Sequence, residues 1–589
     1  MVVNDHNNPG VGKTQRRRLF LLLACAGLWT GLLIGRLGQL QIVMHDELVE
    51  RARERHQYVE SLPATRGDIY AADGSLLASS IQGRAIYVYP HLLDDPESAA
   101  AALAPALQMP VEEVFPLVTQ ETRGLVYLRK FAPPEMVEKV LEVRRRLNLY
   151  TSLGSHEASA RFYPNRQLGA HVLGFVDYDG NGAAGIEYAL DKAIRGQDGQ
   201  WITLKDGGQT PIDPDGIFRE DPVPGHDVFL TLDPAIQRVA EATLERAVHE
   251  HDADGASAVV MDPRTGAVLA LASYPTFNPN VRNEALVELS SANSVVNHAY
   301  EPGSTFKIFT AAAGLTEKVV YEDELIDCQG GALRVANHTY HDWRSGFGVM
   351  PFSQVIANSS NVGTIKVGLR ISPEHFYRWL QGFGFGQPTG IELPGEAPGI
   401  VHEPGSSLWS GLSQSSMIIG QEIGVTPLQL TTAVSAIANG GLLMKPYLVS
   451  QIRDADGTLQ MERRPEVRRR VLDQTVARRV LNVLEGVVRP DNNTGKAAGI
   501  PGYRIAGKTG TAQKIGPDGR YSQYMSSFVG ILPASAPQLV VLVVIDAPRK
   551  GYYGTEVAAP AFRTIAETAV RVLRIAPDAV AAPVQINGS

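Results

Sequence analysis

The sequence predicts an α+β protein with three parts: an N-terminal transmembrane helix, an elongated mixed α/β domain, and a domain whose antiparallel sheet is flanked by helices. Three observations lead to this prediction. An apolar run follows a basic N-terminus. The 589 residues exceed one ordinary domain, and a Pro/Gly-rich stretch at 221–225 divides them. Beyond it, strand and helix patterns alternate in the order expected of helices packed on an antiparallel sheet.

The composition is that of a globular protein, since 44% of the residues are hydrophobic and 20% are charged. A net charge of −8 argues against a nucleic-acid-binding protein, which usually carries a basic excess. The two cysteines, Cys25 and Cys328, lie far apart, so neither a disulfide framework nor a cysteine-based metal site is expected. We expect no cofactor.

The predicted membrane segment begins after Arg16-Arg17-Arg18, where residues 19–35 form an unbroken run of low polarity. Such a run makes roughly 26 Å of helix, and the apolar residues 37–43 would complete the crossing. Basic residues before the run and acidic residues after it predict a cytoplasmic N-terminus. We therefore assign 1–18 to a cytoplasmic tail and 19–41 to a single-pass anchor.

Two other interpretations of this segment involve cleavage. Ala24-Cys25-Ala26 could serve a signal peptidase, and Leu22-Leu23-Ala24-Cys25 resembles a lipoprotein processing site. Both leave only about five apolar residues after the arginines, fewer than the usual 7–15 or so. An uncleaved anchor is favoured. Arg36 is interpreted as an interface residue, although a charge inside a membrane helix can also mark a partner helix.

Residues 42–225 form the first predicted domain. Residues 45–60 are charged with helical spacing and predict a stalk. A strand and a turn are expected from Thr65 to Gly74, and helical segments alternate with loops over 97–148. Residues 161–191 are rich in turn residues.

Residues 226–577 form the second predicted domain. It opens with a strand at 227–232 and a helix to about residue 249, with Asp233 as N-cap and Pro234 in the first turn. A hairpin follows at 256–261 and 267–272. Further helices are expected at 304–316, 351–368, 373–382, 427–438 and 559–573, strands at 504–513, 526–532 and 538–545, and a loose tail at 578–589.

Three short strings in the second domain combine into one candidate active site: Ser304-Thr305-Phe306-Lys307, Ser359-Ser360-Asn361 and Lys508-Thr509-Gly510-Thr511. They follow the order and rough spacing of the S-x-x-K, S-x-N and K-T-G elements of penicillin-binding proteins and serine β-lactamases. The first two strings alone are commonly a helix surface or a helix cap. Their combination predicts an active site.

The first two strings can supply a nucleophile, a base and a proton relay. Ser304 at the start of a helical run would gain the positive end of the helix dipole, and Lys307 would share its face. A lysine serves as a base only when it is neutral, which burial and a second cation, Lys508, would favour. Ser359 would relay a proton to the leaving amine, and Asn361 would hold a substrate amide.

The third string is expected on an edge strand that faces a cleft. There Lys508, Thr509 and Thr511 could bind a substrate carboxylate. Gly510 would let a ligand backbone approach, because it has no Cβ. The backbone N–H groups of Ser304 and Thr511 would form an oxyanion hole.

Over nearly all its length the chain resembles a class B penicillin-binding protein, a membrane-anchored D,D-transpeptidase of peptidoglycan. The resemblance implies that 42–225 is a non-catalytic pedestal and 226–577 a penicillin-binding transpeptidase domain. The strings that carry it are Arg66-Gly67-Asp68, Arg161-x-Tyr163-Pro164, Gly185-Ile186-Glu187, Glu301 to Lys307, Gly424-Val425-Thr426-Pro427-Leu428-Gln429 and Lys508 to Ala512.

The division-specific, FtsI-type branch of the family is most similar. The likeness includes residues 514–521, Gly551-Tyr552-Tyr553-Gly554, KTGT where elongation enzymes usually have KSGT, and Arg36 with Leu40-Gln41. It implies peptidoglycan stem peptides as substrates and septum formation as the role. It also implies an inner-membrane location with a periplasmic catalytic domain, and a SEDS-type glycan polymerase and other divisome proteins as partners.

By this resemblance Ser304 attacks the penultimate D-Ala carbonyl of a stem pentapeptide, and Lys307 is the general base. Ser359 and Lys508 manage the proton, and an amine from a second stem peptide resolves the acyl-enzyme. β-Lactam antibiotics would acylate Ser304. No Glu-x-x-Leu-Asn element lies between Asn361 and Lys508, which argues against a class A β-lactamase.

Other functions stay open on the sequence alone. The chain could be an elongation-type transpeptidase, a D,D-carboxypeptidase, or a non-catalytic β-lactam sensor or scaffold. The first domain contains no glycosyltransferase-like constellation, so a second activity is not expected.

Two patterns suggest metals, but no metal site is predicted. Asp177-x-Asp179-x-Asn181-Gly182 opens like a calcium loop, yet position 12 is Tyr188 and Glu187 falls one residue early. His338, His341 and Asp342 are close in sequence, but their spacing matches no zinc pattern.

Overall fold

The computed structural model describes residues 9–49, 57–122, 124–204, 218–281, 289, 293–489, 491, 494–516 and 519–579. The chain divides into two compact units. The first comprises the residues up to 64 together with 197–223. The second comprises 65–196 and the residues from 224 onward.

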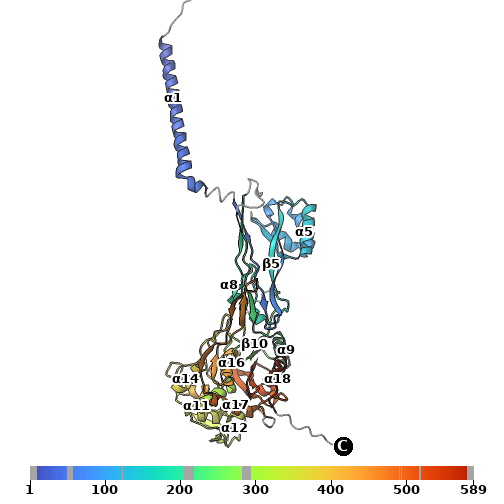
Figure 1. Ribbon diagram of the computed structural model, residues 1–589, viewed down its shortest axis with the longest axis vertical. Coiled ribbons are helices and arrows are strands. Elements are labelled where there is room, and N and C mark those ends of the chain that lie inside the picture. The colour runs from blue at the N-terminus through green and yellow to red at the C-terminus, as the bar shows by residue number, and fades with distance from the viewer. Residues whose placement is uncertain are drawn as a thin grey trace, which may run out of the picture. The chain divides into compact units, whose positions relative to one another are not determined.

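The first unit contains the N-terminal helix and a small sheet. Helix α1 (Pro9–Gly38) continues into a π-helical turn (Gln39–Val43) (Figure 1). The span Thr14–Val43 is long and apolar enough to cross a membrane, and none of its most apolar window is buried. This finding agrees with the predicted anchor.

The same unit holds a three-stranded sheet of β1 (Gln57–Leu62), β6 (Gly199–Leu204) and β7 (Phe218–Glu220), with β6 in the middle. The helical stalk predicted at 45–60 is therefore partly wrong. Residues 45–49 are helical and 50–56 lie outside the described residues, but 57–60 belong to β1. The charge spacing there did not reveal that β1 pairs along its length with β6.

In the second unit, residues 65–196 build strands and a small helical subdomain. Its elements are β2 (Ile69–Tyr70), β3 (Leu76–Val88), η2 (Pro90–Leu92), α3 (Pro96–Leu107), α4 (Val111–Val118), β4 (Val126–Ala132), α5 (Pro134–Arg146), β5 (Leu153–Phe162), α6 (Ala170–Leu173), α7 (Gly185–Ala189) and α8 (Asp191–Ile194). Apolar side chains of α3, α4 and α5 pack against β3, β4 and β5 in one core. The sequence pattern over 97–148 missed β4, which pairs with β3.

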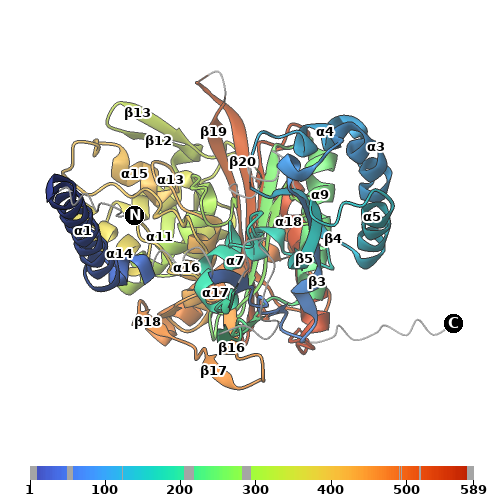
Figure 2. The ribbon, with the colours of Figure 1, turned by 90° about the horizontal axis from the view of Figure 1, so that it is seen from above.

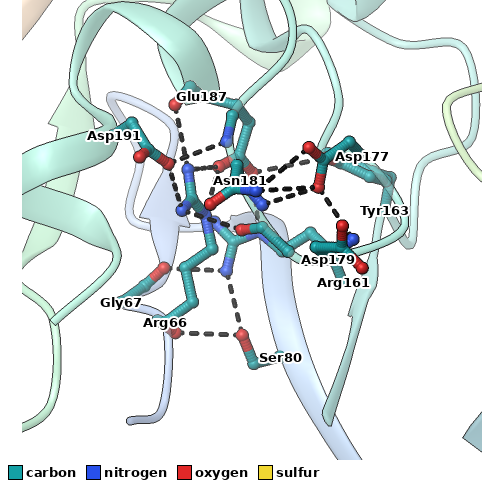
Figure 3. A network of polar contacts seen from close by, with 12 residues as sticks. Arg66, Gly67, Ser80, Arg161, Tyr163, Asp177, Asp179, Asn181, Glu187 and Asp191 are labelled. Atoms are coloured by element: carbon teal, nitrogen blue, oxygen red, sulfur yellow. Dashed lines mark hydrogen bonds and ion pairs between the residues drawn. The ribbon is translucent and has the colours of Figure 1, made fainter. Parts of the chain in front are cut away.

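A buried network of ion pairs joins Arg66, Arg161, Glu187 and Asp191 (Figure 3). The Glu187 carboxylate has no exposed surface and lies between two arginines, at 2.7 Å from Arg66 and 2.6 Å from Arg161. Arg66 also pairs with Asp191 at 2.6 Å, and the Tyr163 hydroxyl donates to Glu187 at 3.3 Å. The three family strings of the predicted pedestal therefore meet at one carboxylate.

The calcium-like loop is closed by its own hydrogen bonds. Asp177 accepts from the backbone N–H groups of Asp179 and Asn181 at 2.8 and 2.9 Å. Asp179 pairs with Lys130 of β4 at 2.9 Å. Glu187 is the residue nearest in sequence to the position of the bidentate calcium ligand. Its carboxylate is paired with Arg66 and Arg161.

The C-terminal part of the second unit is built on a five-stranded antiparallel sheet in the order β10-β9-β21-β20-β19. Helices α9 and α18 cover one face, and α11 and α16 lie on the other (Figure 2). Strand β21 (Leu539–Asp546) is buried over nearly its whole length, which explains its continuous apolar sequence.

The elements of this part are β8 (Asp227–Leu230), α9 (Pro234–His251), β9 (Gly255–Met261), β10 (Val268–Tyr274), η3 (Gly303–Phe306), α11 (Lys307–Thr316), β11 (Leu325–Asp327), η4 (Gln329–Gly331), β12 (Ala332–Val335), β13 (His338–His341), β14 (Val349–Pro351), α12 (Phe352–Ala357), α13 (Asn361–Gly368), α14 (Pro373–Gly382), α15 (Ser413–Ile418), α16 (Pro427–Ala438), β15 (Leu442–Met444), β16 (Val449–Arg453), β17 (Leu459–Glu462), β18 (Val467–Arg470), α17 (Gln474–Val488), η5 (Lys496–Ala498), β19 (Ala506–Ile515), β20 (Tyr521–Leu532), β21 (Leu539–Asp546) and α18 (Gly554–Val572).

A second sheet connects the two parts of this unit. Its order is β17-β16-β8-β2-β3-β4, with β5 also paired to β3. Strand β8 lies beside β2 in parallel and beside β16 in antiparallel orientation. The boundary predicted between residues 225 and 226 stays a prediction.

Most predicted helices and strands of this part are confirmed. The helices whose limits were predicted most accurately begin at a clear N-cap. Helices α14 and α16 have the predicted limits, and α9 begins where Asp233 accepts from two backbone N–H groups. The predicted helix at 304–316 starts as the 3-10 turn η3, and the one at 351–368 breaks at 358–360. Helix α18 begins five residues earlier than expected, and the tail from 580 onward lies outside the described residues.

Candidate active site

Strand β19, which carries Lys508-Thr509-Gly510-Thr511, is the edge strand of the five-stranded sheet. It pairs with β20 on one side only. The expected edge position is confirmed, and it leaves the other side of β19 available to the residues that approach it.

Two glycines bring the Ser304 turn onto this edge. Gly303 has a φ of +54°, and a Cβ there would lie 3.0 Å from Ala512 Cβ. A Cβ on Gly510 would lie 2.3 Å from Ser527 Oγ and 3.0 Å from Pro302 O. The space at Gly510 is therefore taken by the chain itself, which differs from the expected approach of a ligand backbone.

The second string forms the break between α12 and α13. Ser359 has a φ of +59°, a left-handed conformation that is uncommon for serine. Ser360 is the N-cap of α13, and its hydroxyl accepts from the Gly363 N–H at 3.0 Å. The cap and the left-handed residue together direct Ser359 and Asn361 toward Lys307.

Lys307, the first residue of α11, has no exposed surface. Its Nζ donates to Ser359 O at 2.7 Å, to Ser359 Oγ at 3.3 Å and to Asn361 Oδ1 at 2.6 Å. Burial lowers the pKa of Lys307 from 10.5 to about 7, and attraction to Asp342 opposes the shift. A lysine with this pKa can accept a proton near neutral pH.

Lys508 is also fully buried and approaches the same serine from β19. Its Nζ donates to Ser359 Oγ at 2.8 Å and to Thr509 O at 3.3 Å. Burial lowers the pKa of Lys508 well below its ordinary value, and repulsion from Lys307 lowers it further. The Ser359 hydroxyl therefore lies between two buried amines and can pass a proton between them.

A cleft of about 670 Å³ opens beside these groups. Its lining includes Ser304, Ser359 and Asn361, and Thr509 and Thr511 from the edge strand. Lys307 and Lys508 lie behind this surface. The structure thus brings all the predicted site residues to one place, with the lysines beneath the cleft.

Two side chains are arranged differently from the expectation. The Ser304 hydroxyl makes no hydrogen bond with any residue that the structure describes, and Lys307 is bonded to the Ser359–Asn361 turn instead. The Thr511 hydroxyl accepts from the Gly554 N–H at 3.0 Å, which ties β19 to the start of α18.

The cleft also has walls that the motifs did not indicate. Gln421, Thr494 and Trp343 line it, as do Tyr553 and Glu556 at the start of α18. These residues come from four separate places in the chain, so no spacing pattern could have identified them. Tyr553 alone belongs to a string that the family resemblance had singled out.

The histidine-rich string also lies beside the site, but without a metal arrangement. His341 lines the cleft, and Asp342 accepts hydrogen bonds from the Ser360 hydroxyl and the backbone of α13. Within the described ranges, no group of three or more His, Cys, Asp or Glu residues is arranged to hold a metal ion.

Family models match both predicted domains of the chain. Residues 61–230 match the penicillin-binding protein dimerisation domain. Residues 256–567, more than half of the 589, match the penicillin-binding protein transpeptidase domain. The chain belongs to the class B penicillin-binding proteins. The predicted family, fold class and transpeptidase domain are thereby confirmed.

Two relatives are similar to the chain over most of its length. The peptidoglycan D,D-transpeptidase FtsI of Escherichia coli is 32% identical over 571 residues, 96% of this chain and 93% of that protein. Stage V sporulation protein D of Bacillus subtilis is 33% identical over 576 residues, 96% of this chain and 87% of that protein.

A solved structure of the family has the same fold. Penicillin-binding protein 3 of Mycobacterium tuberculosis, complexed with aztreonam, superposes with a TM-score of 0.67 at 30% identity. The match covers 88% of this chain and 98% of that one. Aztreonam is a β-lactam, and that protein binds it.

Proposed function

We propose that this protein is the septal D,D-transpeptidase of its cell and that it acts through an acyl-enzyme on Ser304. The observation that carries the proposal is the pair of fully buried lysines on either side of the Ser359 hydroxyl, directly behind a cleft that exposes Ser304. Burying two amines side by side costs stability, and groups buried in this way cluster at functional sites.

In the first half-reaction, the Ser304 hydroxyl oxygen forms a bond to the carbonyl carbon of the penultimate D-Ala. Lys307, neutral near pH 7, takes the hydroxyl proton. The bond between that carbon and the nitrogen of the terminal D-Ala breaks. The proton reaches the leaving amine through Ser359, which contacts both lysines.

Strand β19 stabilises the negative charge that develops on the carbonyl oxygen and binds the terminal carboxylate of the substrate. The backbone N–H groups of Ser304 and Thr511 stabilise the oxyanion. Thr509 and Thr511 line the cleft, so their hydroxyls lie where the substrate carboxylate binds. Lys508 acts on this end through the Ser359 hydroxyl, to which its buried amine donates.

In the second half-reaction, the amine of a neighbouring stem peptide attacks the ester carbonyl. The new amide forms, the bond to Ser304 oxygen breaks, and the proton lost by the amine returns to Ser304 through Lys307. The same ester formed by a β-lactam keeps its own amine attached, which explains why such a drug would remain bound.

The nucleophile is tested with a fluorescent penicillin on the full-length protein. We expect covalent labelling of the wild type and none of Ser304→Ala, because that variant lacks the hydroxyl proposed to form the ester. Ser407→Ala, at an exposed serine outside the cleft, is the matched control and should label normally. Labelling that survives Ser304→Ala would refute the assignment.

The septal role rests on the similarity to proteins named FtsI and on residues 514–521 and 551–554, which resemble that branch. Depletion of the protein should produce long filaments, because septal cross-linking would stop. Rounded cells would indicate the elongation role instead. Unchanged septal cross-links in cells that carry only Ser304→Ala would favour a scaffold or sensor.

The proposed location is the inner membrane, with the N-terminus in the cytoplasm and the catalytic domain outside. It rests on Arg16-Arg17-Arg18 before the apolar span. A SEDS-type polymerase and other divisome proteins are the proposed partners, contacted through the anchor and the pedestal. Crosslinking from Arg36 of the anchor tests this, and capture of lipid alone would argue against a partner helix.

A further inference from the structure

The β12–β13 hairpin holds the Ser359-Ser360-Asn361 turn through three successive residues. The His341 carbonyl accepts from Asn361 Nδ2 at 2.7 Å. The Trp343 indole donates to Asn358 O at 2.9 Å. Between them, the carboxylate of Asp342 lies against the start of α13.

Asp342 makes the densest set of these contacts. Its carboxylate accepts from Ser360 Oγ at 3.0 and 3.1 Å, from Val362 N at 3.0 Å and from Asn361 N. The Asp342 N–H in turn donates to Gly331 O at 2.9 Å. A carboxylate that accepts backbone N–H groups at a helix N-terminus makes strong, charge-assisted hydrogen bonds.

We propose that Asp342 is a positioning residue of the acyl-transfer site: it fixes the turn that orients Lys307, and it supplies a negative charge near that lysine. This inference rests on the proposed roles of Ser304 and Lys307. It assigns to Asp342 no contact with the substrate.

The orienting effect follows from the chain of contacts. Ser359 is held in a strained, left-handed conformation, which persists only where the surrounding structure imposes it. Asp342 binds the next three residues after Ser359, and Ser359 and Asn361 supply all three acceptors of Lys307 Nζ. Without the carboxylate, the Ser360 hydroxyl and two backbone N–H groups lose their acceptor.

Among the described residues, few groups other than Asp342 can change the electrostatic environment of Lys307. Lys508 faces it from β19, and its own pKa is lowered well below the ordinary value by burial and by Lys307, while Ser304 on η3 and Asn361 on α13 are neutral. The Cys328 thiol, near Ser360 and Asp342, has a pKa raised by burial and is neutral as well. Lys366 and Asp327 act on that thiol with opposite charges.

The sign of the expected pH effect follows directly. Attraction to Asp342 raises the pKa of Lys307 against the lowering by burial. Removal of the negative charge therefore lowers this pKa, so the lysine becomes neutral at a lower pH. The acid limb of the acylation profile, which reports the pKa of the general base, moves to lower pH.

The decisive experiment measures the second-order rate constant of acylation by a fluorescent penicillin from about pH 5 to pH 9. Asp342→Asn keeps the size and one acceptor oxygen but removes the charge. We expect its acid limb at lower pH than that of the wild type, with a lower plateau. Asp327→Asn, the same charge change at an exposed neighbouring acid, should leave the limb in place.

Asp342→Ala also removes the acceptor, so we expect about a 100-fold loss of the plateau rate, the usual effect of an ångström-scale misplacement. If that variant does not fold, Asp342→Asn alone decides. An unshifted limb in Asp342→Asn, or an equal shift in Asp327→Asn, would overturn the proposal. Failure of Ser304→Ala to abolish labelling would instead overturn the nucleophile, so the two failures are distinguishable.

Discussion

The protein buries two clusters of charged side chains, and they differ in how the charges are balanced. In the pedestal, Arg66 and Arg161 surround Glu187, and Asp191 completes the set with two positive and two negative groups. In the active site, Lys307 and Lys508 share one serine hydroxyl, and no carboxylate in the described part of the chain is bonded to either amine.

The difference shows two uses of a buried charge. Burial lowers the pKa of Arg66, but attraction to Glu187 and the contacts with Asp191 outweigh it, so the pKa is raised and the guanidinium stays charged. The pKa of Lys307 falls to about 7 because burial outweighs its attraction to Asp342. Balanced charges therefore hold the fold together, whereas unbalanced charges prepare a base.

The largest expected effect comes from removing the base. Lys307→Met should lower the acylation rate by about 10²–10⁴-fold, the usual contribution of general-base catalysis. It should not destabilise the fold, since a buried amine is replaced by an apolar side chain of similar length. The rate is measured with a fluorescent penicillin and the stability by urea unfolding.

Lys366→Met is the matched control for this change. Lys366 is on α13, and its amine donates to the Asp327 carbonyl at 2.8 Å, outside the cleft. Acylation by this variant should be normal. A Lys307→Met protein that acylates at the wild-type rate would show that the unbalanced cluster has no catalytic role.

The balanced cluster should respond in the opposite way. Glu187→Ala leaves two buried arginines without their shared carboxylate, and we expect a loss of about 3–5 kcal/mol in the free energy of unfolding. The folded fraction should still acylate, because Glu187 lies outside the cleft. Glu157→Ala, at an exposed position of β5, should change the stability little. Near-equal stabilities of the two variants would contradict the structural role.

Local rules predicted much of the fold. The caps Asp233 and Thr426 start α9 and α16 where the sequence places them, and the apolar run of β21 marks a buried central strand. Strand β4 was missed because its alternation is short and half of it faces solvent. Its pairing with the distant β3 is a tertiary effect that no local pattern contains.

The catalytic residues could be predicted from the sequence, but the contacts that hold them in place could not. The three strings identified Ser304, Lys307 and Lys508 as one group, because those residue types in that order suit acyl transfer. The left-handed conformation at residue 359 could not be expected from the sequence, because the residue is a serine and not a glycine. The contact of Asp342 with α13 joins residues about twenty positions apart in the sequence. That Lys508 would lie beneath the cleft also depends on packing.

The smallest predicted effect is the contribution of Lys307 to the pH dependence of stability. Above pH 7 the folded protein releases a proton from Lys307, whereas the unfolded chain keeps it until the ordinary pKa of 10.5. The unfolded state thus binds more protons, so the free energy of unfolding rises with pH through this window, at up to about 1.4 kcal/mol per pH unit. Urea unfolding at pH 7 and pH 8 should therefore show a gain of about 1 kcal/mol in the wild type relative to Lys307→Met. If the free energy of unfolding changes equally with pH in both proteins, Lys307 stays protonated in the folded protein. Its charge would then be balanced, as in the pedestal cluster.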